Sequence, residues 1–315
     1  MEKFVWLLGA GRMAQDYAKV LSAMDYNSLV IGRGKSSAQA FEAATGQRVI
    51  YGGLREFLES KPVCPDAAIV AVGVESLAAI AEELLNFGVR RILLEKPGAL
   101  DRLSLLRLHN LALSLGAEIF IAYNRRFYAS VLEALRWIER DGGVKSFHFE
   151  FTEWGHVIGA LDKSQKIKES WFLANSTHVV DMAFFLGGTP QVLNSLQGGK
   201  LPWHTRASRF VGAGVAENDA LFSYCANWSS PGRWGVEIMT ENFRLIFTPL
   251  EELRVMHKGE VHLEDVIIDN QLDKDFKPGL YRQIEEFLSK SGEHLCSLEK
   301  QLSMWSFYER MAGYS

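Results

Sequence analysis

Cysteine is scarce in this sequence, which has three cysteines among 315 residues. Cys64, Cys225 and Cys296 are far apart and odd in number, which argues against a disulfide framework and against a metal site made of cysteines. Apolar runs of about 18 residues are absent, and the first residues lack the pattern of a signal peptide. Positive charge is not in excess, because the net charge is −4, and this excludes the basic footprint of a nucleic-acid-binding protein. We therefore expect a cytoplasmic protein that binds neither nucleic acid nor a membrane.

The apolar content of 48% is enough for a large core, and a chain of this length favours two domains over one. Residues 1–122 alternate short apolar runs with stretches whose apolar residues recur at helical spacing. The predicted strands are Phe4–Leu8, Ser28–Ile31, Arg48–Tyr51, Ala67–Val72, Ile92–Leu94 and Glu118–Ala122. Helices are predicted after Gly11, over Ser36–Ala44 and Glu75–Phe87, and from an Asp101 N-cap to Leu115. This alternation indicates a doubly wound parallel sheet of the Rossmann type over residues 1–122.

The turn after the first strand reads G-A-G-R-M-A and matches the pattern G-x-G-x-x-G/A of dinucleotide-binding folds. Gly9 is expected to make the tight turn, Gly11 to let the backbone approach a pyrophosphate, and Ala14 to keep helix and strand close. The helix that begins near Arg12 offers free N–H groups and a positive dipole end to an anion. A glycine turn kept only for packing is the alternative. The residues expected to contact the cofactor here are Gly9, Gly11, Arg12, Met13, Ala14, Val72 and Gly73.

The end of the second strand, where an NAD enzyme usually places an acid on the ribose, reads I-G-R-G-K-S-S. Gly32 stands where an acid is expected, and Arg33, Lys35 and Ser36 follow it. These side chains can bind a 2′-phosphate that an acid would repel, at about 1.5–3 kcal/mol for a charge-assisted contact. We therefore expect a preference for NADP over NAD. A solvated basic loop is the alternative interpretation.

Residues 123–315 show a different sequence pattern, in which apolar and polar residues alternate as they do in half-buried strands. Strands are predicted over V-K-S-F-H-F-E-F-T-E-W, Gln191–Leu196, Leu221–Trp228, Gly235–Thr240 and Phe243–Phe247, and more weakly over 252–256 and 261–268. Helices are predicted over Phe127–Arg140, Thr177–Leu186, Leu280–Ser289 and Ser297–Ala312. The segment Ser230–Arg233 has the composition of a hairpin turn. The pattern predicts an α+β domain on an open, mostly antiparallel sheet.

Glu95, Lys96 and Pro97 follow the fifth predicted strand directly. The carboxyl ends of parallel strands line the ligand crevice, so these residues are expected beside the cofactor. A partly desolvated lysine in that place can have a lowered pKa and move a proton. Taken alone, a solvated lysine at the end of a strand is the alternative.

The motifs form an ordered set: the glycine turn near residue 9, E-K-P at 95–97, Y-N-R-R-F at 123–127 and H-V-V-D at 178–181. This set resembles the glucose–fructose oxidoreductase, inositol dehydrogenase and rhizopine-catabolism (Gfo/Idh/MocA) family. The resemblance implies a Rossmann domain followed by an α/β domain whose open sheet carries the substrate and an oligomer interface, in a homodimer or homotetramer. It also implies hydride transfer between NAD or NADP and a hydroxyl or keto carbon of a sugar, inositol or sugar nucleotide.

By the same resemblance, Lys96 and His178 are the catalytic residues, and Glu95, Asn124 and Arg125 lie near the nicotinamide. The residues expected to contact substrate are Lys96, Arg126, Trp154, Asn175, His178 and Asp181. The sequence departs from the family at Ala174, where an aspartate is frequent, so acid–base chemistry is left to Lys96 and His178.

Simpler interpretations exist for several of these residues. His178 can cap its helix, and Asp181 can fix the His178 tautomer, cap the helix or touch substrate. Trp154, like Trp171 and Trp203, can stack on a sugar ring or pack in the core. The pairs His178 with Asp181 and Glu153 with His156 have no third cluster at recognisable spacing, so no metal is expected.

The sequence thus favours an NAD(P)-dependent dehydrogenase or reductase that acts on a CH–OH group of a carbohydrate-like substrate. One rival is a cofactor-binding regulator without turnover, which the loss of the acid at Ala174 favours. The other is a family member with a different reaction, such as a lyase, a hydrolase or a reductase of a non-sugar carbonyl.

Overall fold

The computed structural model describes residues 4–314. The chain folds into two compact units. The first unit runs to Asn124 and includes Leu272–Ser303, and the second comprises Arg125–Gln271 and the residues from Met304 onwards. The chain therefore returns once to the first unit, a feature that the predicted division into 1–122 and 123–315 does not contain. Within the described range, every helix is too short or too polar to cross a membrane.

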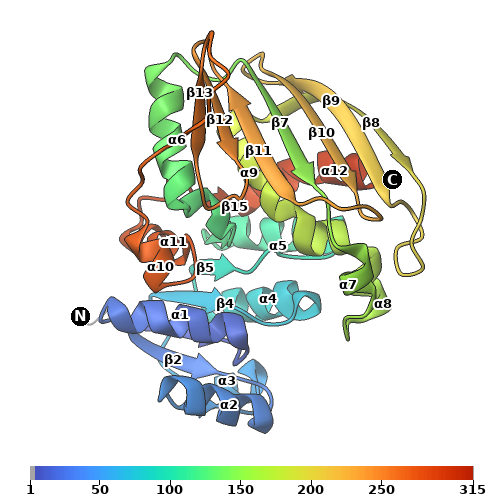
Figure 1. Cartoon of the computed structure of the whole chain (residues 1–315). Coiled ribbons are helices and arrows are strands. Elements are labelled where there is room, and N and C mark those ends of the chain that lie inside the picture. The colour runs from blue at the N-terminus through green and yellow to red at the C-terminus, as the bar shows by residue number, and fades with distance from the viewer. Residues whose placement is uncertain (1–3, 315) are drawn as a thin grey trace. The chain divides into compact units, whose positions relative to one another are not determined.

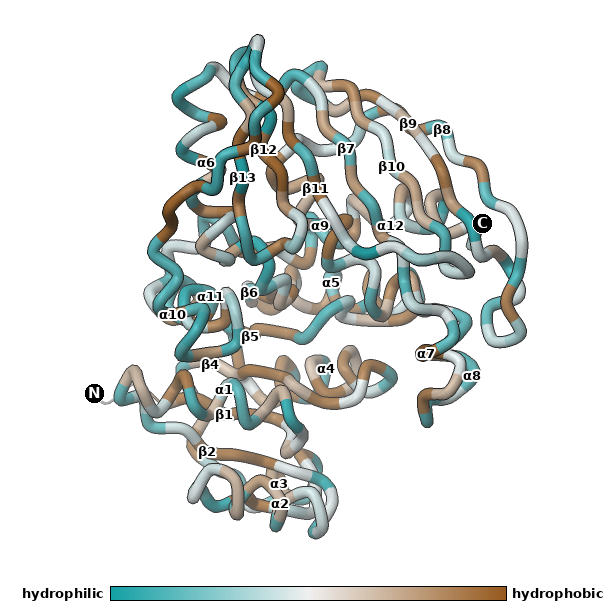
Figure 2. Tube along the Cα trace, in the orientation of Figure 1, coloured by the Kyte–Doolittle hydropathy of each residue, from teal (hydrophilic) through white to brown (hydrophobic). Residues whose placement is uncertain are grey.

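The first unit is built on a seven-stranded sheet in the order β15-β6-β5-β4-β1-β2-β3. Figure 1 labels β2, β4 and β5 of this sheet among the helices that connect its strands. Its parallel strands are β1 (Phe4–Leu8), β2 (Asn27–Ile31), β3 (Val49–Ile50), β4 (Ala67–Val70), β5 (Arg91–Leu94) and β6 (Glu118–Ile121). Their hydrophobic sequences, visible in Figure 2, are mostly buried because helices cover such sheets on both faces. The order of the strands reverses between β1 and β4, and this confirms the predicted doubly wound sheet.

Helices connect these strands: α1 (Arg12–Ala23), α2 (Lys35–Thr45), α3 (Leu54–Glu59), α4 (Leu77–Phe87) and α5 (Arg102–Ser114). The C-cap of α2 is Gly46, whose φ of +72° is the left-handed conformation that glycine adopts without strain. Asp101 caps α5 as predicted, because its side chain accepts a hydrogen bond from the Ser104 amide at 2.8 Å. The short helix α3 has too few apolar residues at helical spacing to be predicted.

The returning segment contributes α10 (Gln271–Asp275), α11 (Leu280–Ser289) and β15 (Cys296–Ser297). Helix α11 is amphipathic and buries Leu280, Ile284 and Phe287, which recur at helical spacing. It packs against α1, and β15 pairs antiparallel with β6 at the edge of the sheet. Sequence periodicity predicts α11 but cannot predict β15, which is two residues long.

The second unit is built on an eight-stranded sheet in the order β14-β13-β12-β11-β7-β10-β9-β8. Its strands are β7 (Ser146–Phe151), β8 (Pro190–Gly198), β9 (Arg209–Ala216), β10 (Leu221–Asn227), β11 (Trp234–Met239), β12 (Phe243–Phe247), β13 (Arg254–His257) and β14 (Glu264–Asp265). Neighbouring strands are antiparallel except β7 and β10, so the predicted sheet type is confirmed. Phe147, Phe149 and Phe151 alternate along β7 and point into the core.

The helices after Asn124 are η2 (Asn124–Phe127), α6 (Ala129–Arg140), α7 (Gly155–Gly159), α8 (Gln165–Glu169), a π-helix η3 (Phe172–Ser176), α9 (Thr177–Gly187) and α12 (Leu298–Ala312). Helix α9 packs on β7 and β11. The approach is close at Gly187, where an added Cβ would lie 2.4 Å from the ring of Phe147. The core of this unit therefore lies between α9 and the aromatic side of the sheet.

Two sequence interpretations of the second unit are wrong or incomplete. Ser230–Arg233 is not a hairpin turn, because β10 and β11 each pair with β7, which lies between them. The composition of a turn does not say which strands it joins. Strand β9 was not predicted, since the sequence R-F-V-G-A-G-V-A has two glycines that weaken a strand signal.

Candidate functional site

The glycine turn after β1 is fixed by a close approach of backbone. Gly9 has a φ of +118°, and an added Cβ would lie 2.3 Å from the carbonyl oxygen of Ala71, just after β4. The Gly9 amide donates a hydrogen bond to the carbonyl of Ile31, the last residue of β2, at 2.8 Å. Only glycine fits this position, which joins the carboxyl ends of three strands.

The start of α1 has the features of an anion site. Its N-cap is Gly11, and no side chain in the described part of the chain caps the helix. An added Cβ on Gly11, or on Gly73 at the start of η1 (Val74–Ser76), would meet no described heavy atom within 4 Å. Uncapped amides that face open space at a helix N-terminus fit the phosphates of a dinucleotide. The predicted residues Arg12, Met13 and Ala14 form this first turn.

The returning segment adds a cation that sequence reasoning missed. The Nζ atom of Lys277 lies 2.9 Å from the sulfur of Met13 and 3.7 Å from a carboxylate oxygen of Asp16, both on α1. Nearby, the side-chain amide of Asn124 donates to the carbonyl of Pro278 at 2.9 Å. About 260 residues separate Lys277 from α1 in sequence, so no local pattern could have revealed it.

The predicted 2′-phosphate loop is solvent-exposed. Arg33, Lys35 and Ser36 are exposed between the end of β2 and the first turn of α2. The N-cap of α2 is Gly34, whose carbonyl accepts a hydrogen bond from the Ser37 hydroxyl at 2.9 Å. Two cations and a hydroxyl thus lie at one uncrowded helix start.

Glu95, at the end of β5, is held by the first helix. The Tyr17 hydroxyl on α1 donates to its carboxylate at 2.7 Å. Burial raises the pKa of Glu95, although the Tyr17 hydrogen bond and the charges of Lys96 and Lys277 oppose this shift. Burial, and then the Glu95 charge, raise the pKa of Tyr17 well above its usual value. Lys96 itself is half-buried.

A pocket of about 350 Å³ lies within the second unit. It is lined by Arg125, Thr152, Glu153, Trp154, Val157, Ile158, Leu161, Trp171, Arg233, Trp234, Leu250 and Glu251. The Arg125 guanidinium lies 4.8 Å from the ring centre of Trp234, and the Arg233 guanidinium lies 5.8 Å from that of Trp154. Aromatic faces and charged groups therefore share one cavity. Arg125 and Trp154 were predicted site residues, whereas Trp234 and Arg233 were not.

Glu153 is a buried carboxylate in the wall of this pocket, with 7% of its surface exposed. Asn175 donates to its two oxygens at 2.9 and 3.2 Å, and the Ser176 hydroxyl donates at 2.8 Å. Both donors belong to the π-helix η3, and such helices are frequent at functional sites. In the sequence, Glu153 attracts attention only as a possible metal ligand together with His156. Among the described residues no group of three potential metal ligands occurs.

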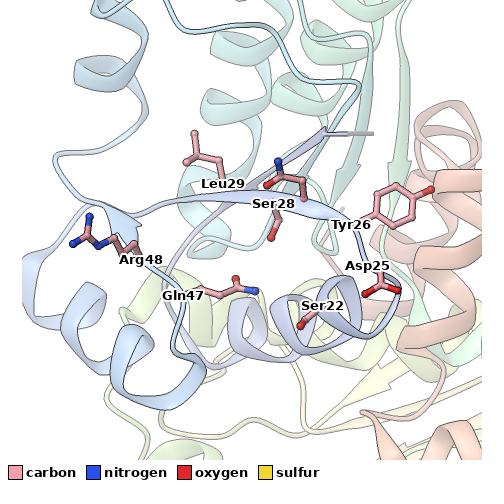
Figure 3. A pocket seen from close by; sticks show the side chains of 8 residues that line it. Ser22, Asp25, Tyr26, Ser28, Leu29, Gln47 and Arg48 are labelled. Carbon is pink, nitrogen blue, oxygen red and sulfur yellow. The ribbon is translucent and has the colours of Figure 1, made fainter. Parts of the chain in front are cut away.

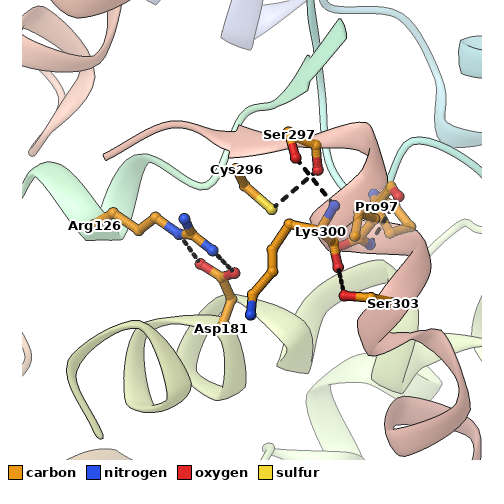
Figure 4. A network of polar contacts seen from close by, with 8 residues as sticks. Pro97, Arg126, Asp181, Cys296, Ser297, Lys300 and Ser303 are labelled. Carbon is orange, nitrogen blue, oxygen red and sulfur yellow. Dashed lines mark hydrogen bonds and ion pairs between the residues drawn. The ribbon is translucent and has the colours of Figure 1, made fainter. Parts of the chain in front are cut away.

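Arg126 and Asp181 form a buried, two-pronged ion pair (Figure 4). The guanidinium donates from Nε at 2.7 Å and from Nη2 at 2.6 Å, so each carboxylate oxygen of Asp181 accepts one bond. One turn earlier on α9, His178 is 8% exposed and its ring centre lies 6.3 Å from that of Trp234. This geometry favours Asp181 as a positioning residue for α9. Its contact with substrate, and that of Arg126, stay predictions.

The first unit has a hollow of about 800 Å³ that is lined by none of the predicted site residues (Figure 3). Ser22 and Asp25 at the end of α1, the start of β2, and Gln47 and Arg48 before β3 line it. These residues lie at the amino end of β2, whereas the glycine turn lies at the carboxyl end of β1. This hollow is therefore not the predicted cofactor site.

Removal of the Asp181 carboxylate should destabilise the fold, because it leaves a buried guanidinium without its charge partner. We expect Asp181→Ala to lower the free energy of unfolding by about 3–5 kcal/mol. Urea unfolding followed by circular dichroism measures this change. The exposed residue Asp162 supplies the control, since Asp162→Ala should change the free energy by less than about 0.5 kcal/mol. An equal, small effect of both variants would contradict the prediction.

The raised pKa of Glu95 makes part of the stability depend on pH. Above its ordinary pKa the folded state still binds a proton that the unfolded state releases, so the stability linked to Glu95 falls as pH rises through the raised value. Glu95→Gln removes this titration and keeps an oxygen for the Tyr17 hydroxyl. We expect the Tm of Glu95→Gln, relative to wild type, to increase between about pH 5 and pH 8. Thermal unfolding at several pH values tests this, with the exposed Glu59→Gln variant expected to show a constant difference.

Comparison with solved structures shows that the fold is shared with known dehydrogenases. Levoglucosan dehydrogenase, in complex with NADH and L-sorbose, is 17% identical, with 99% of this chain and 96% of that chain covered and a TM-score of 0.80. UDP-N-acetylglucosamine 3-dehydrogenase GnnA from Acidithiobacillus ferrooxidans is 17% identical, with 98% and 96% covered and a TM-score of 0.74. The WlbA dehydrogenase from Bordetella pertussis, in complex with NADH and UDP-GlcNAcA, is 16% identical, with 99% and 95% covered and a TM-score of 0.74.

Curated protein sequences give no match to this chain. Residues 4–123 match the model of the Gfo/Idh/MocA family, described as an oxidoreductase family with an NAD-binding Rossmann fold. This match over residues 4–123 confirms the resemblance carried by the glycine turn and the E-K-P motif.

Proposed function

We propose that the protein is an NAD(P)-dependent oxidoreductase that transfers a hydride between the nicotinamide and a hydroxyl or keto carbon of a sugar-like substrate. The observation that carries this proposal is the pocket of the second unit, in which the Glu153 carboxylate lies among tryptophan rings. The family of residues 4–123 and the dehydrogenases that share the fold support the same class of reaction.

The lining of this pocket suits a polyhydroxylated ring. Indole faces pack against the apolar C–H face of a sugar, while carboxylate and guanidinium groups hydrogen-bond its hydroxyls. Trp154, Trp171 and Trp234 supply the first kind of contact, and Glu153 and Arg125 supply the second. Because Asn175 and Ser176 hold Glu153 in place, the carboxylate is already oriented for a substrate hydroxyl.

The first unit would hold the dinucleotide. The amides at the start of α1 and the open space beside Gly11 would receive its phosphates, with Gly9, Arg12, Met13 and Ala14 around them. Lys277 would add a positive charge at the same turn. When bound, the nicotinamide supplies the hydride acceptor or donor.

The proton of the reacting oxygen is assigned to Lys96, with assistance from His178. An aspartate that is frequent in the family is replaced by Ala174, so this chain has no carboxylate at that position. Glu153 supplies a buried carboxylate 21 residues earlier, and we assign it to a substrate hydroxyl. Asn175 then acts through Glu153, to which it donates two hydrogen bonds.

Turnover and substrate affinity should respond to different residues. We expect Lys96→Met to lower kcat by about 10²–10⁴-fold, the share of a general acid–base group, with cofactor affinity nearly unchanged. Glu153→Gln should instead raise KM by about tenfold or more, because a charge-assisted hydrogen bond to substrate is lost. Reduction of NAD⁺ and NADP⁺ across a panel of sugars, inositols and sugar nucleotides measures both parameters. Full activity of Lys96→Met would remove the lysine from the mechanism.

The same panel separates the rival functions. A bound cofactor that never changes its redox state would favour a regulator without turnover, for which the absence of an acid at Ala174 is the supporting observation. A cofactor that is reduced and reoxidised within each cycle would favour a lyase or hydrolase. Net cofactor reduction with one polyol class supports the proposed dehydrogenase.

We further propose that NADP is preferred over NAD, and Arg33 and Lys35 are the residues to test. Replacement of both by serine should weaken NADPH binding by about tenfold to a hundredfold, since charge-assisted contacts to the 2′-phosphate are lost. NADH binding should change by less than about twofold. Calorimetry with both reduced cofactors gives the four affinities, and tighter NADH binding to the wild type would overturn the preference.

A homodimer or homotetramer is the assembly we propose. Large apolar side chains are exposed on three adjacent strands of the second sheet: Val192 and Leu196 on β8, Val211 on β9 and Leu221 on β10. Exposed apolar residues on neighbouring strands are typical of a surface that a partner covers.

A further inference from the structure

A second cavity lies beside the pocket of the second unit. Its volume is about 900 Å³, and it is lined by Trp154, Gly155, His156, Gly159, Gln165, Leu201, Pro202, Trp203, Trp228, Ser229, Ser230 and Pro231. Trp154 lines both cavities and is 52% exposed. Its indole N–H donates to the carbonyl of Gly232 at 3.2 Å, which orients the ring between them.

The two cavities differ in charge. The first is lined by Arg125, Glu153, Arg233 and Glu251, whereas no lysine, arginine, aspartate or glutamate is among the described residues that line the second. Trp154 presents the exposed indole of the second cavity, whereas Trp203 and Trp228, which are 8% and 2% exposed, support its wall from behind. The rings of Trp203 and Trp228 stack at 5.8 Å with an angle of 10°, and the Trp203 N–H donates to the carbonyl of Gly155 at 2.8 Å.

We propose that the two cavities form one elongated site, and that the second cavity binds the neutral second ring of a disaccharide-type substrate. This inference rests on the proposed function, because it takes the first cavity as the place of the reacting sugar. Trp154 contacts both rings, and the serine, glutamine and histidine side chains around the second cavity meet hydroxyl groups. The substrate class is therefore a glycoside of at least two sugar rings.

A sugar nucleotide suits the second cavity less well. Its diphosphate carries about two negative charges, and protein sites for such groups use arginine, lysine or a helix N-terminus. Arginine and lysine are absent from the described residues that line the second cavity, and the two helices that begin in this lining, α7 and α8, are each only five residues long. The two arginines of the first cavity lie over tryptophan rings. A neutral ring with hydroxyl groups needs no charge and matches indole, hydroxyl and amide side chains.

Ser229→Phe tests the proposal, because Ser229 is exposed, lines the second cavity and does not line the first. The probes are glucose with cellobiose and maltose, N-acetylglucosamine with chitobiose, mannose with mannobiose, and UDP-glucose. Calorimetry of the full chain with saturating cofactor gives their affinities. We expect one disaccharide to bind wild type about three- to tenfold more tightly than its monosaccharide, the range for one added aromatic contact. Ser229→Phe should remove this difference and leave the monosaccharide affinity unchanged.

The matched control is Thr205→Phe, at an exposed residue that lines neither cavity, and it should keep the disaccharide advantage. Disaccharides that bind no more tightly than monosaccharides would overturn the elongated site while the proposed function stands. An advantage of UDP-glucose that Ser229→Phe abolishes would assign the cavity to a nucleotide and also overturn it. Binding of cofactor but of no sugar, large or small, would instead overturn the proposed function and this inference with it.

Discussion

The first unit depends on one constraint, the close approach of Gly9 to the carbonyl of Ala71. Any side chain at residue 9 would collide with that oxygen at 2.3 Å, so β1 and β4 could not end side by side as they do. The turn directs the chain into α1, and α1 carries Tyr17 to the Glu95 carboxylate at the end of β5. One backbone approach thus aligns the uncapped start of α1 with the strand end that carries Lys96.

The segment that returns to the first unit is held there by a second contact, between a cation and two aromatic rings. The Arg91 guanidinium lies between the rings of Phe120 on β6 and Phe287 on α11, 4.9 and 5.1 Å from their centres. Its Nε also donates to the Phe287 carbonyl at 2.8 Å. A desolvated cation between two aromatic rings stabilises their packing by about 2 kcal/mol or more. By fixing α11, this contact also fixes the preceding segment, which places Lys277 beside Met13.

The parts of the fold that follow from local rules could be predicted from the sequence. The buried parallel strands, the Asp101 cap and the glycine turn each depend on residues close together in the chain. Contacts between distant segments could not be predicted. Lys277 near α1, β15 beside β6, and β7 between β10 and β11 all depend on which surfaces meet after folding.

The candidate site shows the same contrast between features that local sequence predicts and features that depend on distant contacts. The resemblance placed Arg125 near the nicotinamide, and Trp154 was one of three tryptophans that could stack on a sugar ring. Both line the pocket of the second unit, and their roles stay predictions. Trp234 and Arg233 were missed, because nothing in their local sequence distinguishes a pocket residue from the start of a strand. Asn175 as a substrate ligand stays a prediction, and in the structure its side-chain N–H donates to Glu153. That orientation depends on the π-helix, whose extra residue per turn no hydrophobic period reveals.

Glu153 is a buried carboxylate, so its desolvation must be compensated by hydrogen bonds. Burial of an uncompensated carboxylate costs several kcal/mol, and hydrogen bonds such as those from Asn175 and Ser176 offset that cost. Both donors come from the π-helix η3, so the position of this carboxylate after β7 depends on the local geometry of that helix.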